Sequence, residues 1–269
     1  MSTLATTISA YLAIGAGAGF FAGLLGVGGG LIMVPALVIL FEGIGLPRAF
    51  VFQIALGTSM ATILFTSISS LRTHHRHGAV IWPVVRAIAP GILVGTAAGT
   101  WLARHLSVHA LAVFFSGFMV FVALQMTMNL RAKPSRALPG NLGIAAVGSV
   151  IGVISALAAI GGGAMTVPFL SWCNVPMRRA IGTSAAVGFP IALGGTLGYI
   201  VNGMNIAGLP EWSLGFVYLP ALASILATSV IAAMFGAHAA HRLPVPMLKK
   251  IFSSLLILLA VKMLIQLFG

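Results

Sequence analysis

Acidic side chains are almost missing from this sequence. Its 269 residues include two of them, Glu42 and Glu211, against fourteen Lys and Arg. Only 6% of the residues are charged and 59% are hydrophobic, whereas a soluble domain carries about 25% charged residues. A chain this poor in charge cannot cover a surface that faces water. We therefore predict an integral protein of the lipid bilayer that crosses it several times.

Cysteine is nearly absent as well, and the familiar catalytic motifs are missing. The single Cys173 excludes an internal disulfide, and we interpret it as a small buried apolar residue. The sequence contains no Ser/His/Asp set, no His-Glu-x-x-His pair and no phosphate-loop Lys. We expect neither an enzyme nor a bound cofactor or metal. The basic residues fall in short connections between apolar runs, which favours membrane topology over nucleic-acid binding.

The apolar runs themselves contain no carboxylate, because both glutamates fall in connections. Proton pumps and cation carriers usually depend on carboxylates within the membrane. A route without negative charge is better suited to anions or to neutral solutes.

Eight apolar runs predict the membrane helices of an all-α protein. They lie at about 11–41, 50–71, 79–103, 109–130, 142–173, 178–201, 212–237 and 247–268. A helix of about 20 residues spans a bilayer, and six runs have this length. The first and fifth runs are too long for one crossing.

The two long runs resemble each other, which indicates an internal duplication. GGGLIMVP at 28–35 matches GGGAMTVP at 161–168, and ALGTS at 55–59 matches AIGTS at 180–184. Trp82 and Pro90 match Trp212 and Pro220 in the same order. We predict a first transmembrane repeat at 1–130, a polar linker at 131–141 and a second repeat at 142–269, together forming one membrane domain.

Three glycines and a following proline stand in each long run, and we expect a broken helix there. Glycine costs a helix interior about 1 kcal/mol relative to alanine, and proline removes a hydrogen bond. Backbone groups freed at membrane depth must be buried in protein or line a polar cavity. Paired breaks of this kind indicate a transporter's binding site, and the N–H groups that follow them favour an anion. Close helix packing through small residues is the alternative, which we assign to Gly15, Gly19, Gly23, Gly91, Gly95 and Gly99.

The basic residues favour an arrangement in which both long runs turn back at their glycines. One side of the membrane then holds ten of them: Arg72, Arg76, Arg131, Lys133, Arg136, Arg178, Arg179, Arg242, Lys249 and Lys250. The other side holds Arg48, Arg104 and both glutamates. Eight full crossings would divide the same residues five against seven, so the positive-inside rule supports the hairpins. We predict inverted repeats, each with a Gly-broken, re-entrant helix and three transmembrane helices, and both termini outside.

A few polar side chains remain as candidates for a site. Hydroxyls follow the breaks in both halves, at Thr58, Ser59, Thr183 and Ser184. They can donate to an anion, or bond back to their own helix carbonyl. The segment RTHHRHG contains His74, His75 and His77, which suggest a metal site or a pH sensor. A solvated basic loop is the interpretation that we favour for it.

The paired motifs GLLGVGGGLIMVP and ALAAIGGGAMTVP, with the two GTS sequences at 57–59 and 182–184, resemble the sulfite exporter TauE/SafE family, also called TSUP. The resemblance covers essentially the whole chain. It implies a permease of the bacterial inner membrane, or of another membrane, for small sulfur-containing anions or organic acids. Sulfite, sulfonates, sulfoacetate and thiosulfate are examples.

We therefore expect a multi-pass secondary carrier for a small anion, with a substrate site between the repeats. The expected lining residues are Gly28, Gly29, Gly30, Thr58, Ser59, Gly161, Gly162, Gly163, Thr183 and Ser184. A passive anion channel and a non-transporting scaffold subunit are the alternatives. The expected partners are the bilayer and the anion, without nucleic acid. The oligomeric state stays open, with a homodimer as one option.

Overall fold

The structure, a computed structural model, describes residues 2–25, 29–128, 136–240 and 245–268. In this part of the chain all regular structure is helical except for one small hairpin. The first half contains α1 (Ser2–Leu25), α2 (Gly30–Gly43), α3 (Val51–Arg76), α4 (Trp82–His105) and α5 (Val108–Thr127). The second contains α6 (Asn141–Ala158), α7 (Gly163–Trp172), α8 (Met177–Gly203), β1 (Ser213–Leu214), β2 (Val217–Tyr218), α9 (Leu219–Ala240) and α10 (Val245–Phe268).

Seven helices among the described residues are long and apolar enough to cross a membrane. The two over-long apolar runs are both divided, as their glycines predict. The first becomes α1 and α2, and the fifth becomes α6 and α7. With 14 and 10 residues, α2 and α7 rise about 21 and 15 Å, less than the roughly 30 Å of a hydrocarbon core. The second arm of each pair is therefore too short to cross alone.

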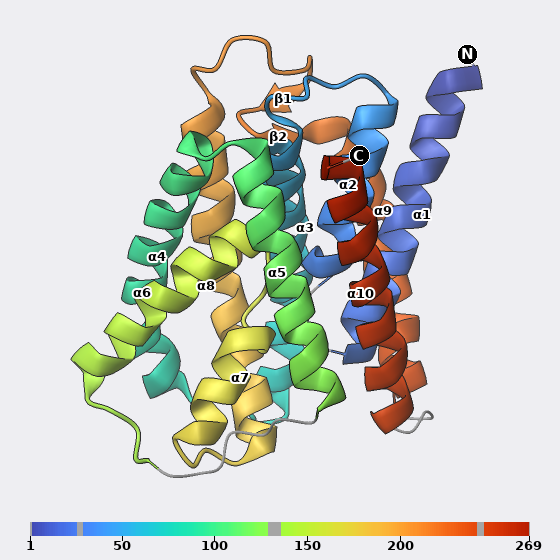
Figure 1. The fold of residues 1–269 in the computed structure, drawn as a ribbon. Helices are drawn as coiled ribbons and strands as arrows, with labels where there is room; N and C mark the ends of the chain where they lie inside the picture. Colours follow the sequence, from blue (N-terminus) through green and yellow to red (C-terminus); the bar gives the residue numbers. More distant parts are fainter. Residues whose placement is uncertain (1, 26–28, 129–135, 241–244, 269) are drawn as a thin grey trace.

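The divided helices enter from opposite ends of the bundle (Figure 1). The chain starts at the upper end, α1 descends, and α2 returns to the upper end. α6 rises from the lower end and α7 leads back to it. Both termini lie at the upper end in this view, which is the arrangement that two inverted hairpins require.

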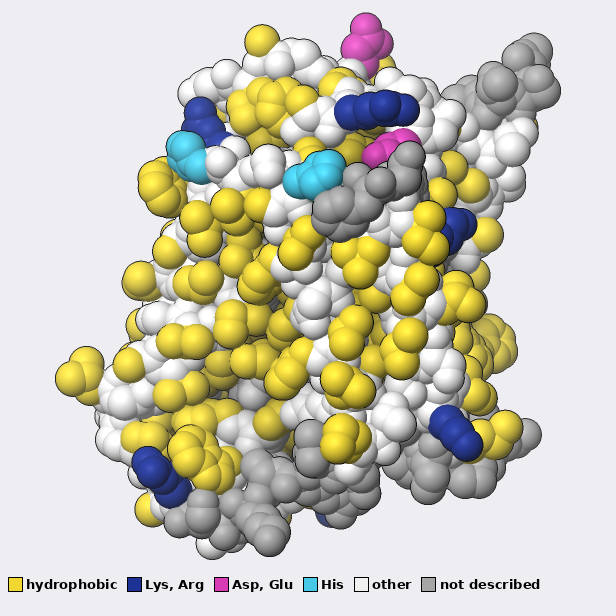
Figure 2. Space-filling view, in the orientation of Figure 1, with side chains coloured by type: hydrophobic (Ala, Val, Ile, Leu, Met, Phe, Trp, Pro, Cys, Tyr) yellow, Lys and Arg dark blue, Asp and Glu magenta, His cyan; other side chains and the backbone are white. Residues whose placement is uncertain are grey.

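Charged groups gather at the two ends, and an apolar belt lies between them (Figure 2). The acidic groups visible in this view lie at the upper end. The lower-end connections and helix termini contain Arg72, Arg76, Arg136, Arg178, Arg179 and Lys250. Arg131, Lys133 and Arg242 lie outside the described residues. Exposed apolar side chains such as Val94, Val150 and Phe235 belong to spans and suit contact with lipid chains.

Each half packs its first helix against the fourth helix of the other half: α1 lies along α9, and α6 along α4. A Cβ on Gly15 would lie 2.6 Å from the Ile225 carbonyl oxygen, and a Cβ on Gly148 would lie 2.6 Å from that of Ile88. Gly15 and Gly148 occupy equivalent positions when the triple glycines at 28–30 and 161–163 are aligned. Ile88 and Ile225 both stand six residues after the first residue of their helices. These matched contacts support the duplication, which stays a prediction.

Glycines spaced by four provide this close helix packing. Gly91, Gly95 and Gly99 lie against the α6 backbone, and Gly19 lies against Ser229 on α9. The small-residue interpretation therefore holds for them and for Gly15. The surroundings of Gly23 lie outside the described part of the chain.

The predicted pairing of Trp82 and Pro90 with Trp212 and Pro220 is wrong. Pro83 and Pro220 are the second residues of α4 and α9, so these two prolines correspond. The apolar run from 212 also begins as the β1–β2 hairpin rather than as a helix. Trp212 and Gly215 have φ values of 64° and 57°, left-handed conformations that break a helix.

The core surrounds α3, whose first half is buried on every face from Val51 to Ile63. Large aromatic side chains pack around it. Phe52 packs against Phe115 of α5, and Tyr199 of α8 packs against Phe216 in the turn of the β1–β2 hairpin. Any polar group in this half of α3 therefore lies inside the protein and requires a partner.

Candidate functional site

The two helix breaks touch each other at the centre of the bundle. Gly30, the first residue of α2, lies so close to Ala159 that a Cβ at position 30 would overlap the Ala159 carbonyl oxygen. A Cβ on Gly29 would lie 2.9 Å from the Ala18 carbonyl oxygen. Both glycines are packed against protein backbone. Gly28, the remaining predicted residue of this triplet, lies outside the described residues.

Ala159 ends α6 in a left-handed conformation, with φ 44° and ψ 48°. This conformation is unfavourable for an L-residue by about 1–2 kcal/mol. It reverses the chain between α6 and α7, and it directs the Ala159 carbonyl at Gly30. The break in the second half is therefore shaped by backbone geometry as well as by Gly161, Gly162 and Gly163.

The two predicted threonines have matching structural partners. The backbone N–H of Tyr218 donates to Thr58 Oγ1 at 3.0 Å, and the N–H of Ile81 donates to Thr183 Oγ1 at 3.0 Å. The acceptor is the Thr58 hydroxyl on α3 in the first bond and the Thr183 hydroxyl on α8 in the second. The first bond holds the chain immediately before α9, and the second holds the chain immediately before α4.

A glycine precedes each threonine and permits this approach. A Cβ on Gly57 would lie 2.5 Å from the Phe216 carbonyl oxygen, and a Cβ on Gly182 would lie 2.5 Å from that of Ala79. In each GTS sequence the glycine therefore makes room for an incoming segment. The following threonine accepts a hydrogen bond from it.

The two serines of these motifs differ. Ser184 Oγ donates to the Ile181 carbonyl at 2.8 Å, the back-bonding arrangement within its own helix. Ser59 Oγ is buried without a hydrogen-bond partner among the described residues. Because β2 lies at the upper end and α4 starts at the lower end, the two GTS motifs lie toward opposite ends (Figure 1). They do not form one cluster.

A cavity of about 320 Å³ lies between the lower half of α3, the start of α7, α8 and α9. It takes Gly161, Gly162, Gly163 and Ser184 from the predicted set. Gly29, Gly30, Thr58, Ser59 and Thr183 are not among its lining residues. The candidate site therefore surrounds the helix break between α6 and α7. It contains only part of the set of lining residues predicted from the sequence.

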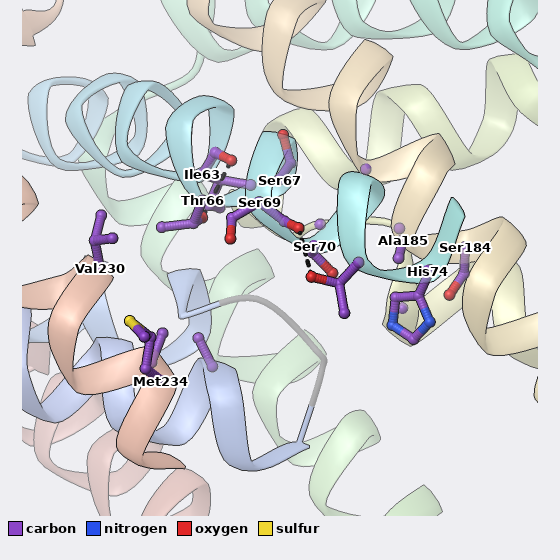
Figure 3. A pocket seen from close by; sticks show the side chains of 17 residues that line it. Ile63, Thr66, Ser67, Ser69, Ser70, His74, Ser184, Ala185, Val230 and Met234 are labelled. Atoms are coloured by element: carbon purple, nitrogen blue, oxygen red, sulfur yellow. Dashed lines mark hydrogen bonds between the residues drawn. The ribbon is translucent and has the colours of Figure 1, made fainter. Parts of the chain in front are cut away.

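Most of the polar lining comes from α3, which the sequence analysis missed. Ser67, Ser70 and His74 project from α3, while Ser184 lies on α8 and Met234 on α9 (Figure 3). Residues at spacings of three and four share a helix face, so Ser67, Ser70 and His74 line one side together. This periodic signal is present in the sequence. It continues past the expected helix end at residue 71, since α3 runs to Arg76.

The α7 N-terminus adds backbone donors to the cavity. Thr166 N–H donates to the Gly162 carbonyl at 2.9 Å, so helical bonding begins there. The N–H groups before Thr166 have no partner within their own helix. A Cβ on Gly162 would overlap the Ser184 carbonyl, so glycine is required for this packing against α8. Hydroxyls, backbone N–H groups and an imidazole together suit an anion.

The histidine segment is helical rather than a loop as far as Arg76, the last residue of α3, and His77 is the C-cap. It is solvated as expected, because all of its residues except His74 are exposed. His74 is half-buried and lines the cavity. His75 Nδ1 accepts a hydrogen bond from Trp82 Nε1 at 3.2 Å, and His77 Nδ1 lies 2.8 Å from the Thr73 carbonyl. Among the described residues, no three His, Cys, Asp or Glu are grouped as metal ligands. Cys173 is buried, as expected from its apolar surroundings.

Comparison with known proteins places the chain among membrane transporters. Residues 11–263 match the sulfite exporter TauE/SafE family. A probable membrane transporter protein of Haemophilus influenzae is 39% identical over 97% of this chain and 99% of its own length. A second, YunE of Bacillus subtilis, is 26% identical over 69% of this chain and 76% of its own.

A probable membrane transporter protein of Methanocaldococcus jannaschii, MJ0441, is 27% identical over 79% of this chain and 78% of its own length. No solved structure shows a significant match to the chain. The match to the family extends across both divided helices and both GTS motifs. The chain therefore belongs to the sulfite exporter TauE/SafE family of membrane transporters.

Proposed function

We propose that this protein is a secondary carrier for a small anion, of the class of sulfite, thiosulfate or sulfoacetate, in a bacterial inner membrane. The observation that carries the proposal is the lining of the cavity. The α7 N-terminus, His74 and the Ser70 hydroxyl supply donors, and no carboxylate is among the described lining residues. The hydroxyls of Ser67 and Ser184 donate to carbonyls of their own helices here, and they can turn to an anion by giving up those bonds. A sulfur oxyanion presents several acceptor oxygens, which match such a set of donors. The volume of about 320 Å³ lies at the lower end of small-molecule sites.

Basic residues at the lower end would guide an anion to this cavity. Arg72, Arg76, Arg178 and Arg179 are exposed in helix ends there. A cluster of one charge sign raises the local concentration of the opposite ion. By the positive-inside rule, this end faces the cytoplasm.

Dense packing toward the upper end favours a carrier over a passive channel. Gly30 and Ala159 are in contact between the two breaks. Beyond them, Tyr199 is buried, its hydroxyl donates to the Ala156 carbonyl at 3.0 Å, and its ring packs on Phe216. A carrier exposes its site to one side at a time, whereas a channel requires a continuous path. We therefore infer that this structure has its site open toward the lower end.

Ligand-dependent stability of the purified protein tests the substrate class. A ligand that binds only the folded form stabilises it by about 2.7 kcal/mol at 100 times its Kd. Thermal unfolding is followed with sulfite, sulfate, thiosulfate, taurine, sulfoacetate and lactate, and with cations as controls. We expect a selective rise in Tm with a sulfur anion. A rise with cations alone would contradict the proposal.

A methyl group added inside the cavity tests the location of the site. A Cβ on Gly188 would lie 3.5 Å from Gly162 N, an ordinary contact, so Gly188→Ala should fold. It should nevertheless weaken anion binding, because the methyl covers the α7 N-terminus. Gly117→Ala, on α5 with open space around it, is the matched control. Equal binding by both variants would place the site elsewhere, and counterflow in liposomes separates a carrier from a channel.

A further inference from the structure

His74 is the single ionisable side chain among the described residues that line the cavity. The other elements around it contribute Ala22 from α1, the α7 glycines, Ser184, Ala185 and Gly188 from α8, and Val230, Ala233 and Met234 from α9. None of these side chains titrates. Within the described part of the chain, no hydrogen bond ties the His74 ring to another residue. The imidazole is thus the one group that can change the charge of this lining.

The charged groups around this end are cations or other histidines. On α3 and its C-cap they are Arg72, Arg76, His75 and His77. At the start of α8 they are Arg178 and Arg179, and in the second turn of α4 there is Arg86. Arg136 stacks on the Trp172 ring at 4.9 Å, and Lys250 lies near the start of α10. The two carboxylates of the chain, Glu42 and Glu211, belong to α2 and to the β1 connection at the other end. No acidic partner at this end can pair with an imidazolium at position 74.

An imidazolium in this cavity would therefore find its counterion in the bound anion. An anion beside an imidazole favours the protonated ring, and the protonated ring strengthens anion binding in return. Binding of the two ions is then linked, since each raises the affinity for the other. The usual carrier of coupled protons, a carboxylate within the membrane, is missing from this sequence.

We propose that His74 couples anion binding to proton binding, so that the carrier moves the anion together with one proton. This inference rests on the proposed carrier function and adds its coupling ion. His74 is the proton-binding residue of the site, and the Ser70 hydroxyl and the N–H groups at the α7 N-terminus are neighbouring donors to the anion. The charge that crosses the membrane per cycle is one unit more positive than that of the anion alone.

The pH dependence of binding by the wild-type protein is the first test. Methanesulfonate and thiosulfate are suitable probes, because both stay ionised across the range and add no titration of their own. If one proton binds with the anion, Kd rises by up to about tenfold per pH unit once the pH exceeds the range in which the free His74 imidazole is protonated. A Kd that is constant between about pH 5.5 and 8 would overturn the coupling while leaving the anion site intact. Failure of both probes and of the wider anion panel to bind at any pH would contradict the proposed function itself.

Proton movement in proteoliposomes is the second test. With a pH-sensitive dye inside, uptake of the probe should acidify the lumen for the wild-type protein. His74→Gln should remove this signal and flatten the pH profile. His74→Lys should bind the anion at every pH without moving protons, because its charge is fixed in this range.

His77→Gln is the matched control, since His77 is the C-cap of α3, three residues after His74, and is exposed with its Nδ1 2.8 Å from the Thr73 carbonyl oxygen. It should still move a proton with the anion, and it should at most shift the pH profile, because His77 interacts electrostatically with His74. Proton uptake that persists in His74→Gln, or that is lost equally in His77→Gln, would refute the role of His74. Unchanged thermal unfolding without ligand shows that each variant is folded.

Discussion

The carbonyl oxygen of Ala159 lies against Gly30, so the helix break of one half packs directly against the helix break of the other half. This contact leaves no room for a side chain at position 30. It also fixes where α2 begins relative to the end of α6. The two breaks therefore form one structural unit.

Replacing Gly30 by alanine should destabilise the protein. The added methyl would overlap backbone, which cannot rotate away, and overpacking of this kind costs about 1–3 kcal/mol or more. Thermal unfolding of the purified variant in detergent measures the loss. Gly117→Ala, with open space around it, should unfold at or slightly above the wild-type temperature. Equal stability of the two variants would disprove the contact.

Position 159 should accept glycine and reject valine. Glycine adopts the observed φ of 44° without strain, whereas a β-branched side chain is strongly disfavoured there. Ala159→Gly should fold at wild-type yield with stability within about 1 kcal/mol, because relief of strain offsets the added freedom of the unfolded chain. Ala159→Val should lower Tm clearly. A stable valine variant would show that the left-handed turn is not required.

Thr58→Val and Thr183→Val should lower the free energy of unfolding. Any loss of transport should be a consequence of this lower stability. Each removes the acceptor of a backbone N–H, that of Tyr218 or Ile81, at a cost of about 1–3 kcal/mol. The corresponding serine variants keep the hydroxyl and should restore most of the loss. Thr62→Val is the matched control, because the Thr62 hydroxyl only bonds back to the Thr58 carbonyl. Unfolding curves of all five variants test this, and wild-type stability of both valine variants would contradict it.

The basic lower end should face the cytoplasm. In a Cys173→Ser background, Ala207→Cys in the connection after α8 should react with an impermeant thiol reagent in intact cells. Ala137→Cys, in the connection before α6, should react only after the cells are broken. Both positions are exposed. The reverse labelling pattern would invert the proposed orientation.

Composition predicted the membrane class, because a chain with so little charge cannot cover a surface that faces water. Motif spacing predicted the family and the two divided helices, because a helix break depends on local glycine and proline chemistry. The site was predicted only in part. The GTS threonines recur in the sequence as ligands would, yet Thr58 and Thr183 bind backbone N–H groups from segments 160 and 102 residues away. Recurrence in a sequence cannot separate a structural role from a binding role when the partner is so distant.

The lining of the cavity was missed for a related reason. Apolar composition falls off after residue 71, so the end of α3 was taken for a loop, and His74 with it. The helix continues because Ser67, Ser70 and His74 face a cavity rather than lipid, and polar side chains are tolerated there. A hydropathy boundary marks where lipid contact ends, which differs from where a helix ends.

The exchanged packing of α1 on α9 has a consequence for biogenesis. Nearly two hundred residues separate the end of α1 from the start of α9, and a ribosome adds roughly 5–20 residues per second. During an interval of about 10–40 s, the glycine face around Gly15 and Gly19 has no partner from its own chain. Either lipid or the insertion machinery must cover this face until α9 is made. A chain interrupted at the 131–141 linker would leave both α1 and its half of the bundle incomplete, so the protein matures only when its last helices enter the membrane.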